Sequence, residues 1–165
     1  MISAAIALAI LAASAAAAGE PPKKVAVFRF ELIDTSGGPP RGEEARLDLI
    51  TDILRRRLNE SDRYEVVDMG AISALEDKRM AELAAGGYFH DCNGCEADIA
   101  AALGADLSIA GTVQKVSNLI LNFNVYIRDA ATGELVEAHS VDIRGNTDRT
   151  WSHGISWMIR NRLLK

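Results

Sequence analysis

Two cysteines separated by two residues are the feature of this sequence with the clearest chemical potential. Cys92 and Cys95 are the only cysteines of the 165-residue chain. Such a pair at the start of a helix can hold a thiolate, because the helix dipole and the free N–H groups of the first turn stabilise negative charge. Asp91 and Glu96 flank the pair, however, and like charge raises a thiol pKa. A structural disulfide is therefore favoured, and thiol-dependent redox chemistry or ligand sensing through the pair is the alternative function.

A metal site is a third interpretation of the cysteine pair. His90, Cys92 and Cys95 offer three ligands, one fewer than a closed structural zinc site needs, so a distant histidine would have to complete it. Haem attachment is excluded, because it requires a His directly after the second cysteine, where Glu96 stands. We expect no cofactor, and we treat the three residues as a weak metal candidate.

The motifs of common enzyme classes are missing from the sequence. The loop around Gly37 and Gly38 lacks the Gly-Lys-Ser/Thr ending that holds phosphates in a P-loop. There is no Gly-x-Ser-x-Gly elbow, no His-Glu-x-x-His helix, and no strand followed by Gly-x-Gly-x-x-Gly. We therefore expect a protein that is not an enzyme.

The last predicted helix, residues 149–163, carries two different faces. One stripe is apolar and is expected to face the core: Trp151, Ile155, Met158 and Ile159. The other side offers a candidate partner-binding surface, because an exposed Trp beside an Arg is typical of interaction hot spots. Its residues are His153, Trp157, Arg160 and Leu164. The alternative is a helix that is buried on both sides.

The polar segment before this helix could take part in the same surface. Arg144, Asn146 and Asp148 lie at a junction between a predicted strand and the helix. The simplest interpretation is that residues 146–148 cap the helix, because Asn, Thr and Asp satisfy the free N–H groups of a first turn. Partner binding by Arg144, Asn146 and Asp148 is the alternative.

The hydrophobic pattern predicts the elements that must position these residues. It indicates strands at 25–32, 64–68, 106–114, 119–128 and 135–144, and helices at 43–59, 71–85, 96–103 and 149–163. Residues 129–134 form the turn of a hairpin between the last two strands. The order βαβααβββα predicts an α/β (α+β) domain, with a mixed five-stranded sheet flanked by helices.

Three consecutive arginines, Arg55, Arg56 and Arg57, lie near the end of the helix at 43–59. Consecutive residues of a helix point about 100° apart, so they do not form one basic patch. Cations are favoured at this end of a helix. We expect all three side chains to be solvated.

The amino-terminal residues predict export. Residues 2–18 hold no charged side chain and end on the small residues Ala16, Ala17 and Ala18, as a signal peptidase site does. The stretch is shorter than the about 20 apolar residues that a membrane-spanning helix needs. We expect a signal peptide at 1–18, a single domain at 19–165 and a periplasmic location, where a disulfide can form. A retained membrane anchor is the alternative. The net charge of −5 gives no basis for nucleic-acid binding.

Several sequence blocks resemble a known group of envelope proteins. Residues 25–30 (VAVFRF), 102–113 (ALGADLSIAGTV) and 128–134 (RDAATGE) are similar to the α/β domain shared by the amino-terminal domain of TolB, the curli secretion channel subunit and the lipoprotein activators of penicillin-binding proteins. Residues 92–96 (CNGCE), 113–119 (VQKVSNL) and 144–148 (RGNTD), with Trp151, resemble a secreted bacterial family of unknown function.

This resemblance implies a TolB-like fold and a binding role. Members of the broader group bind other envelope proteins and perform no chemistry. The chain lacks the lipid-attachment cysteine of the activators and the pore-forming insertions of the channel subunit. We therefore expect a periplasmic accessory or interaction module that docks on another envelope protein or complex, without a membrane span after signal cleavage.

Overall fold

The computed structural model describes residues 20–74, 89, 92 and 94–165. The predicted signal peptide, His90 and most of the helix predicted at 71–85 lie outside these residues. The strands are β1 (Lys23–Val27), β2 (Glu31–Asp34), β3 (Tyr64–Val66), β4 (Leu107–Lys115), β5 (Ile120–Asp129) and β6 (Leu135–Arg144). The helices are α1 (Glu43–Asn59), a 3-10 helix (Met69–Ala74), α3 (Cys95–Ala102), α4 (Asp148–Met158) and a π-helical turn (Ile159–Leu163).

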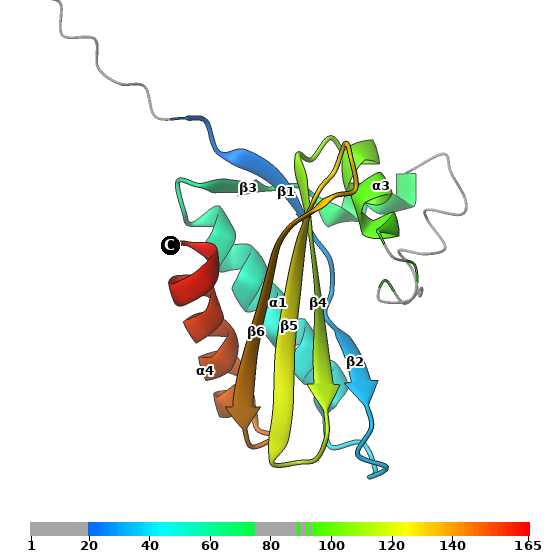
Figure 1. The fold of residues 1–165 in the computed structure, drawn as a ribbon, viewed down its shortest axis with the longest axis vertical. Coiled ribbons are helices and arrows are strands. Elements are labelled where there is room, and N and C mark those ends of the chain that lie inside the picture. Colours follow the sequence, from blue (N-terminus) through cyan, green and yellow to red (C-terminus); the bar gives the residue numbers. More distant parts are fainter. Residues whose placement is uncertain (1–19, 75–88, 90–91, 93) are drawn as a thin grey trace, which may run out of the picture.

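All six strands belong to one mixed sheet, in the order β3-β1-β4-β5-β6, with β2 also paired to β4 (Figure 1). Strand β1 pairs in parallel with β3 and with β4, and β2 pairs in parallel with β4. Strands β4, β5 and β6 form an antiparallel meander. The predicted mixed sheet with flanking helices is confirmed. The sheet has six strands and not five, because the strand predicted at 25–32 is divided into β1 and β2.

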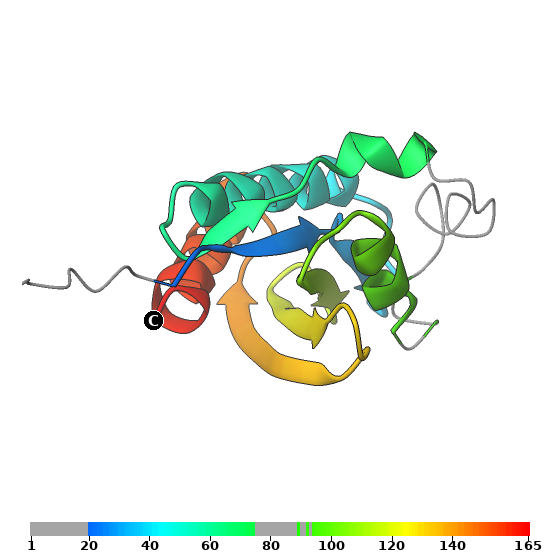
Figure 2. The ribbon, with the colours of Figure 1, turned by 90° about the horizontal axis from the view of Figure 1, so that it is seen from above.

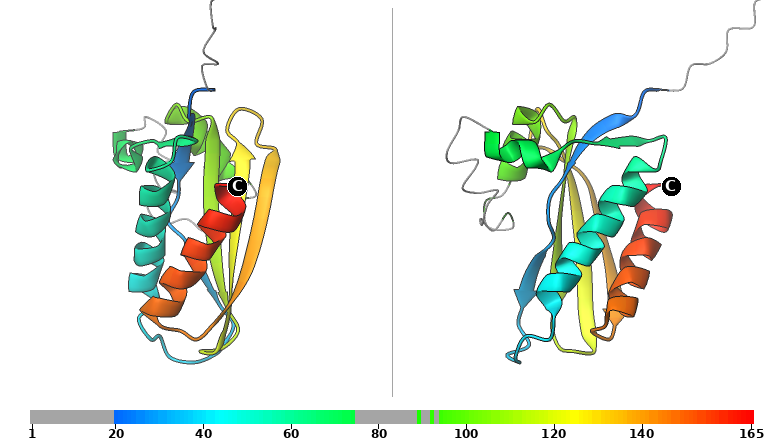
Figure 3. Two further views of the ribbon diagram at one scale, coloured as in Figure 1. Left: turned by 90° about the vertical axis from the view of Figure 1, so that its left-hand side faces the viewer. Right: turned by 180° about the vertical axis from the view of Figure 1, so that it is seen from behind.

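The helices cover the two faces of the sheet unequally. Helices α1 and α4 lie side by side on one face (Figure 3), and the larger hydrophobic core fills the space beneath them. Helix α3 covers one end of the opposite face (Figure 2), over a smaller core that includes Ala26, Phe28 and Ile99. The rest of this second face, on β5 and β6, carries polar and partly exposed side chains such as Asn122 and Asn124.

A bulge separates β1 from β2. Val27 lies opposite Ile109 and Glu31 lies opposite Thr112. The three residues 28–30 therefore lie opposite only two residues of β4, 110 and 111. The extra residue shifts the alternation of side chains by one position. Phe30 therefore points into the larger core together with Val27, although the two are three residues apart.

Helix α1 supplies the hydrogen bonds that the bulge removes from the sheet. The Phe30 N–H donates to Thr51 Oγ1 at 3.1 Å, and the Arg55 guanidinium donates to the Val27 carbonyl at 2.8 and 3.1 Å. Buried backbone groups need such partners. Arg55 is consequently half-buried, so its predicted solvation is wrong, whereas Arg56 and Arg57 are exposed as expected. Burial lowers the pKa of the Arg55 guanidinium.

We predict that Gly111→Ala destabilises the protein by about 1–3 kcal/mol, the usual cost of overpacking a core. A Cβ at position 111 would overlap the ring of Phe30, which fills the space that the bulge creates. Gly38→Ala is the matched control, since only the Ser36 hydroxyl lies near its Cβ, at 3.7 Å. Urea unfolding measures both variants, and equal losses of stability would contradict this account of the bulge.

Candidate functional site

Helix α4 begins with the predicted cap. Thr147 is the N-cap residue, and its hydroxyl accepts the Thr150 N–H at 3.3 Å. The Thr150 hydroxyl accepts the Thr147 N–H in return, at 3.2 Å. These reciprocal bonds form a capping box, which fixes where the helix starts and how the chain enters it.

The predicted division of the last helix into two faces is confirmed in most positions of α4 and of the π-helical turn that follows it. All four residues of the predicted core stripe are buried: Trp151, Ile155, Met158 and Ile159. On the other side His153 and Arg160 are exposed, and Trp157 is 36% exposed. The Arg162 guanidinium lies 5.7 Å from the centre of the Trp157 ring. Leu164 differs, because it packs against the core.

A groove of about 490 Å³ lies between α4 and β6. It is lined by Val141, Asp142, Ile143, Arg144, Arg149, Thr150, His153, Gly154 and Trp157. Gly154 lets the helix approach the sheet closely, because a Cβ there would overlap Ile143 and lie 3.2 Å from the Phe123 ring. The structure thus brings together three of the predicted site residues, Arg144, His153 and Trp157.

Two arginines that line the groove, Arg144 and Arg149, and the exposed Arg160 beyond it have no carboxylate partner among the described residues. Within the described part of the chain, Arg144, Arg149 and Arg160 make no side-chain hydrogen bond or ion pair. By contrast Arg46 and Arg128 each contact a carboxylate, at 2.7 and 2.9 Å. Asp142 is the one carboxylate among the lining residues. The surface defined by this groove and the outer face of α4, called the α4–β6 surface below, therefore has positive charges available to a ligand.

Asn146 and Asp148, also predicted to bind a partner, contact α1 and not this groove. The Asn146 amide donates to Glu43 Oε1 at 2.7 Å, and its carbonyl accepts from Arg46 at 3.0 Å and from the Trp151 indole at 3.1 Å. Asp148 pairs with Arg46 at 2.7 Å. The two residues thereby join α1 to α4. A binding role for them stays a prediction.

Glu43, which accepts from Asn146, also contacts a buried lysine that the sequence analysis did not identify. We call this group of contacts around Glu43 the Lys115 cluster. Lys115 has no exposed surface, and its ammonium lies 2.7 Å from Glu43 Oε1 and 2.9 Å from Asp34 Oδ2. Strand alternation places it on the same face as buried Val113, which was the signal available in the sequence. The amide of Asn146 also donates to Asn118, so two of the blocks shared with the resembled family meet here.

The charges of this cluster stabilise one another. Burial alone would raise the pKa of Glu43, but hydrogen bonds from Lys115, the Arg41 N–H and Asn146 outweigh it and lower that pKa to about 2. Hydrogen bonds from Ser36 and then Lys115 lower the pKa of Asp34 to about 2. The hydrogen bond to Glu43 is the largest cause that raises the pKa of the Lys115 ammonium.

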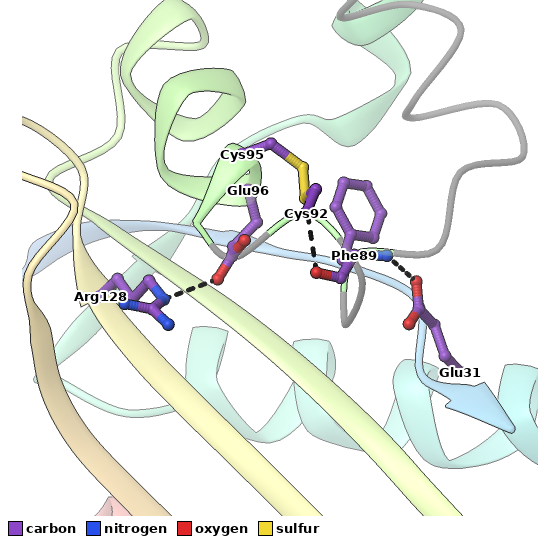
Figure 4. The surroundings of a disulfide bond; sticks show 6 residues. All are labelled: Glu31, Phe89, Cys92, Cys95, Glu96 and Arg128. Atoms are coloured by element: carbon purple, nitrogen blue, oxygen red, sulfur yellow. Dashed lines mark hydrogen bonds and ion pairs between the residues drawn. A yellow bond between two sulfur atoms is a disulfide. The ribbon is translucent and has the colours of Figure 1, made fainter. Parts of the chain in front are cut away.

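The cysteine pair lies at the start of α3, as predicted, and a disulfide joins Cys92 to Cys95 (Figure 4). The next residue, Glu96, is buried and pairs with Arg128 of β5 at 2.9 Å. Among the described residues, the ligand atoms of Cys92, Cys95 and Glu96 lie within 4.8 Å of one another. Sulfurs bonded to each other offer no thiolate to a metal, and His90 lies outside the described residues. The disulfide links Cys92, just before α3, to Cys95, the first residue of that helix.

Solved structures share this architecture. The chain is similar to the LpoB C-terminal domain from Salmonella enterica, with a TM-score of 0.55 and 15% identity, over 77% of this chain and 87% of that one. It is also similar to lipoprotein GNA1162 from Neisseria meningitidis, with a TM-score of 0.53 and 13% identity, over 86% and 99% of the two chains. The protein therefore has the fold of these domains.

The sequence defines the family more narrowly. Residues 23–163 match the family DUF3280, described as "Protein of unknown function (DUF2380)". The chain belongs to this family. The comparison with curated proteins finds no match.

We predict that Lys115→Met lowers the free energy of unfolding by about 3–5 kcal/mol at pH 7, since it leaves buried Glu43 without its cation. Folded carboxyls with a pKa near 2 contribute stability above their unfolded pKa of about 4, and lose it as the pH falls toward 2. Wild-type stability should therefore fall between about pH 4.5 and 2, with a smaller slope in Lys115→Met. Exposed Lys24→Met is the control. Equal stability and equal pH slopes for the two variants would refute the cluster's role.

We predict a reduction potential below about −300 mV for the Cys92–Cys95 disulfide, which is typical of structural disulfides in exported proteins. Equilibration with thiol buffers of known potential measures it. A potential between about −270 and −120 mV, the range of thiol oxidoreductases, would favour thiol exchange as the function instead.

Proposed function

We propose that this protein is a non-enzymatic accessory module of the cell envelope, which binds another envelope protein through the α4–β6 surface. The observation that carries the proposal is the position of Trp157, 36% exposed beside a groove of about 490 Å³. Trp and Arg dominate the energetics of protein interfaces. In the monomer the Arg162 guanidinium, 5.7 Å from the ring centre, covers the indole only in part, whereas a partner would bury it.

Fold and sequence support the envelope part of the proposal. The fold is that of the LpoB C-terminal domain and of a lipoprotein. Residues 25–30, 102–113 and 128–134 resemble a group whose members bind other envelope proteins. The predicted signal peptide at 1–18 and the disulfide are consistent with an exported protein. No helix in the described part of the chain is long and apolar enough to cross a membrane. Periplasmic location after signal cleavage is part of this proposal.

We predict that Trp157→Ala reduces the amount of a specific envelope partner that co-purifies with the protein by at least about tenfold, as expected for a hot-spot residue. The matched control is Leu119→Ala, which removes an apolar side chain that is 62% exposed, in the turn between β4 and β5. Quantitative mass spectrometry of the captured proteins gives the readout. If the wild type captures no specific protein, or if both variants capture the same amount, the proposed surface is wrong.

A further inference from the structure

Strand β6 leaves one edge of the sheet open. It is the last strand in the order β3-β1-β4-β5-β6, and the described residues pair nothing to its outer side. It is ten residues long, and it begins with two exposed apolar residues, Leu135 and Val136. A long edge strand with free peptide groups is a template for another extended chain.

The register identifies which peptide groups are free. The Gly145 N–H donates to the Leu119 carbonyl at 2.9 Å, and hydrogen-bonded and non-hydrogen-bonded pairs alternate along an antiparallel ladder. The odd-numbered residues 139–143 of β6 therefore direct their peptide groups toward β5. The residues that direct their N–H and C=O groups outward are Ala138, Ser140, Asp142 and Arg144.

Helix α4 turns this open edge into one wall of a groove. The helix lies over β6, and its outer residues His153 and Trp157 line the same groove as the edge residues Asp142 and Arg144. Side chains of an added strand would alternate between the two faces of the sheet. One set would pack on Trp157 and His153, and the other would extend the polar second face.

The charges favour an acidic occupant. Arg144, Arg149 and Arg160 have no carboxylate partner in the described part of the chain. A second copy of this chain is disfavoured, because antiparallel pairing of two β6 edges would place both α4 helices on the same face. The unpaired Arg149 and Arg160 of the two copies would then face each other across the seam.

We infer that the α4–β6 surface binds an extended acidic segment of the partner protein, which adds to β6 as a seventh strand of the sheet. Its backbone pairs with the four outward residues of β6 and its apolar side chains pack beside Trp157 on the α4 face. Its carboxylates lie on the opposite face, where the alternation from buried Ile143 places Arg144. This inference rests on the proposed function and specifies how the same surface recognises its ligand.

A peptide of alternating Glu and Val residues tests the inference directly, and a peptide of alternating Lys and Val residues is its charge control. Amide hydrogen exchange of the purified protein, followed by NMR, reports each peptide group. The acidic peptide should slow exchange at Ala138, Ser140, Asp142 and Arg144 by at least about tenfold, since these N–H groups gain partners. Residues 139, 141 and 143 should change little. The lysine peptide should leave all of them unchanged.

A pair of variants tests the contribution of the β6 peptide groups separately from that of the side chains on the α4–β6 surface. Ala138→Pro removes one outward N–H, whereas Ala138→Gly keeps it, and neither changes a charge. The proline variant should bind the acidic peptide up to about tenfold more weakly than the glycine variant, the loss expected for one hydrogen bond. Thermal unfolding of both variants checks that β6 remains paired with β5.

Three outcomes would overturn the inference. The acidic peptide could leave the four alternate amides unprotected, the lysine peptide could bind equally well, or the same amides could become protected with rising protein concentration alone, which would assign the edge to a second copy. If co-purification still depends on Trp157 in any of these cases, the proposed function stands and the inferred acidic partner strand fails. If no partner is captured but the alternate amides are protected, recognition by β6 stands and the envelope role fails.

Discussion

The buried contact of Lys115 with Glu43 and Asp34 is the interaction on which the rest of the structure depends. A buried ammonium is tolerated only where carboxylates surround it, so the ends of β2 and β4 and the start of α1 must meet at one point. Asn146 extends the cluster from Glu43 to the Trp151 indole. This chain of contacts fixes α4 against α1 and β6, and with them the groove that carries Trp157.

Much of the fold follows from local sequence patterns. The helix at 43–59 has the bounds that its apolar periodicity predicts, and the hairpin follows from two alternating strands around a turn. The division of the first strand could not be predicted. The bulge depends on Thr51 and Arg55 of α1, which lie more than twenty residues after their partners Phe30 and Val27, and a local pattern does not contain such contacts. For the same reason Arg55 is half-buried and not solvated.

The candidate site was predictable in part. Amphipathic spacing identified Trp157 and His153, because helix periodicity determines which residues share a face. The same spacing placed Leu164 on the exposed face with them, but Leu164 lies after the regular turns of the helix and packs against the core. The free edge of β6 was missed because strand order is a property of the whole sheet. The contacts of Asn146 with Glu43 and Arg46 were missed because these two residues come from α1, far away in the sequence.

Site-specific photocrosslinking in intact cells tests the central claim, that the α4–β6 surface is where a partner binds. A photoreactive phenylalanine analogue replaces Trp157, Ala138 or, as a control on the exposed side of α1, Asp52. The account predicts one and the same adduct from positions 157 and 138, and none from position 52. No adduct at 157 and 138, or an equal adduct at 52, would contradict it.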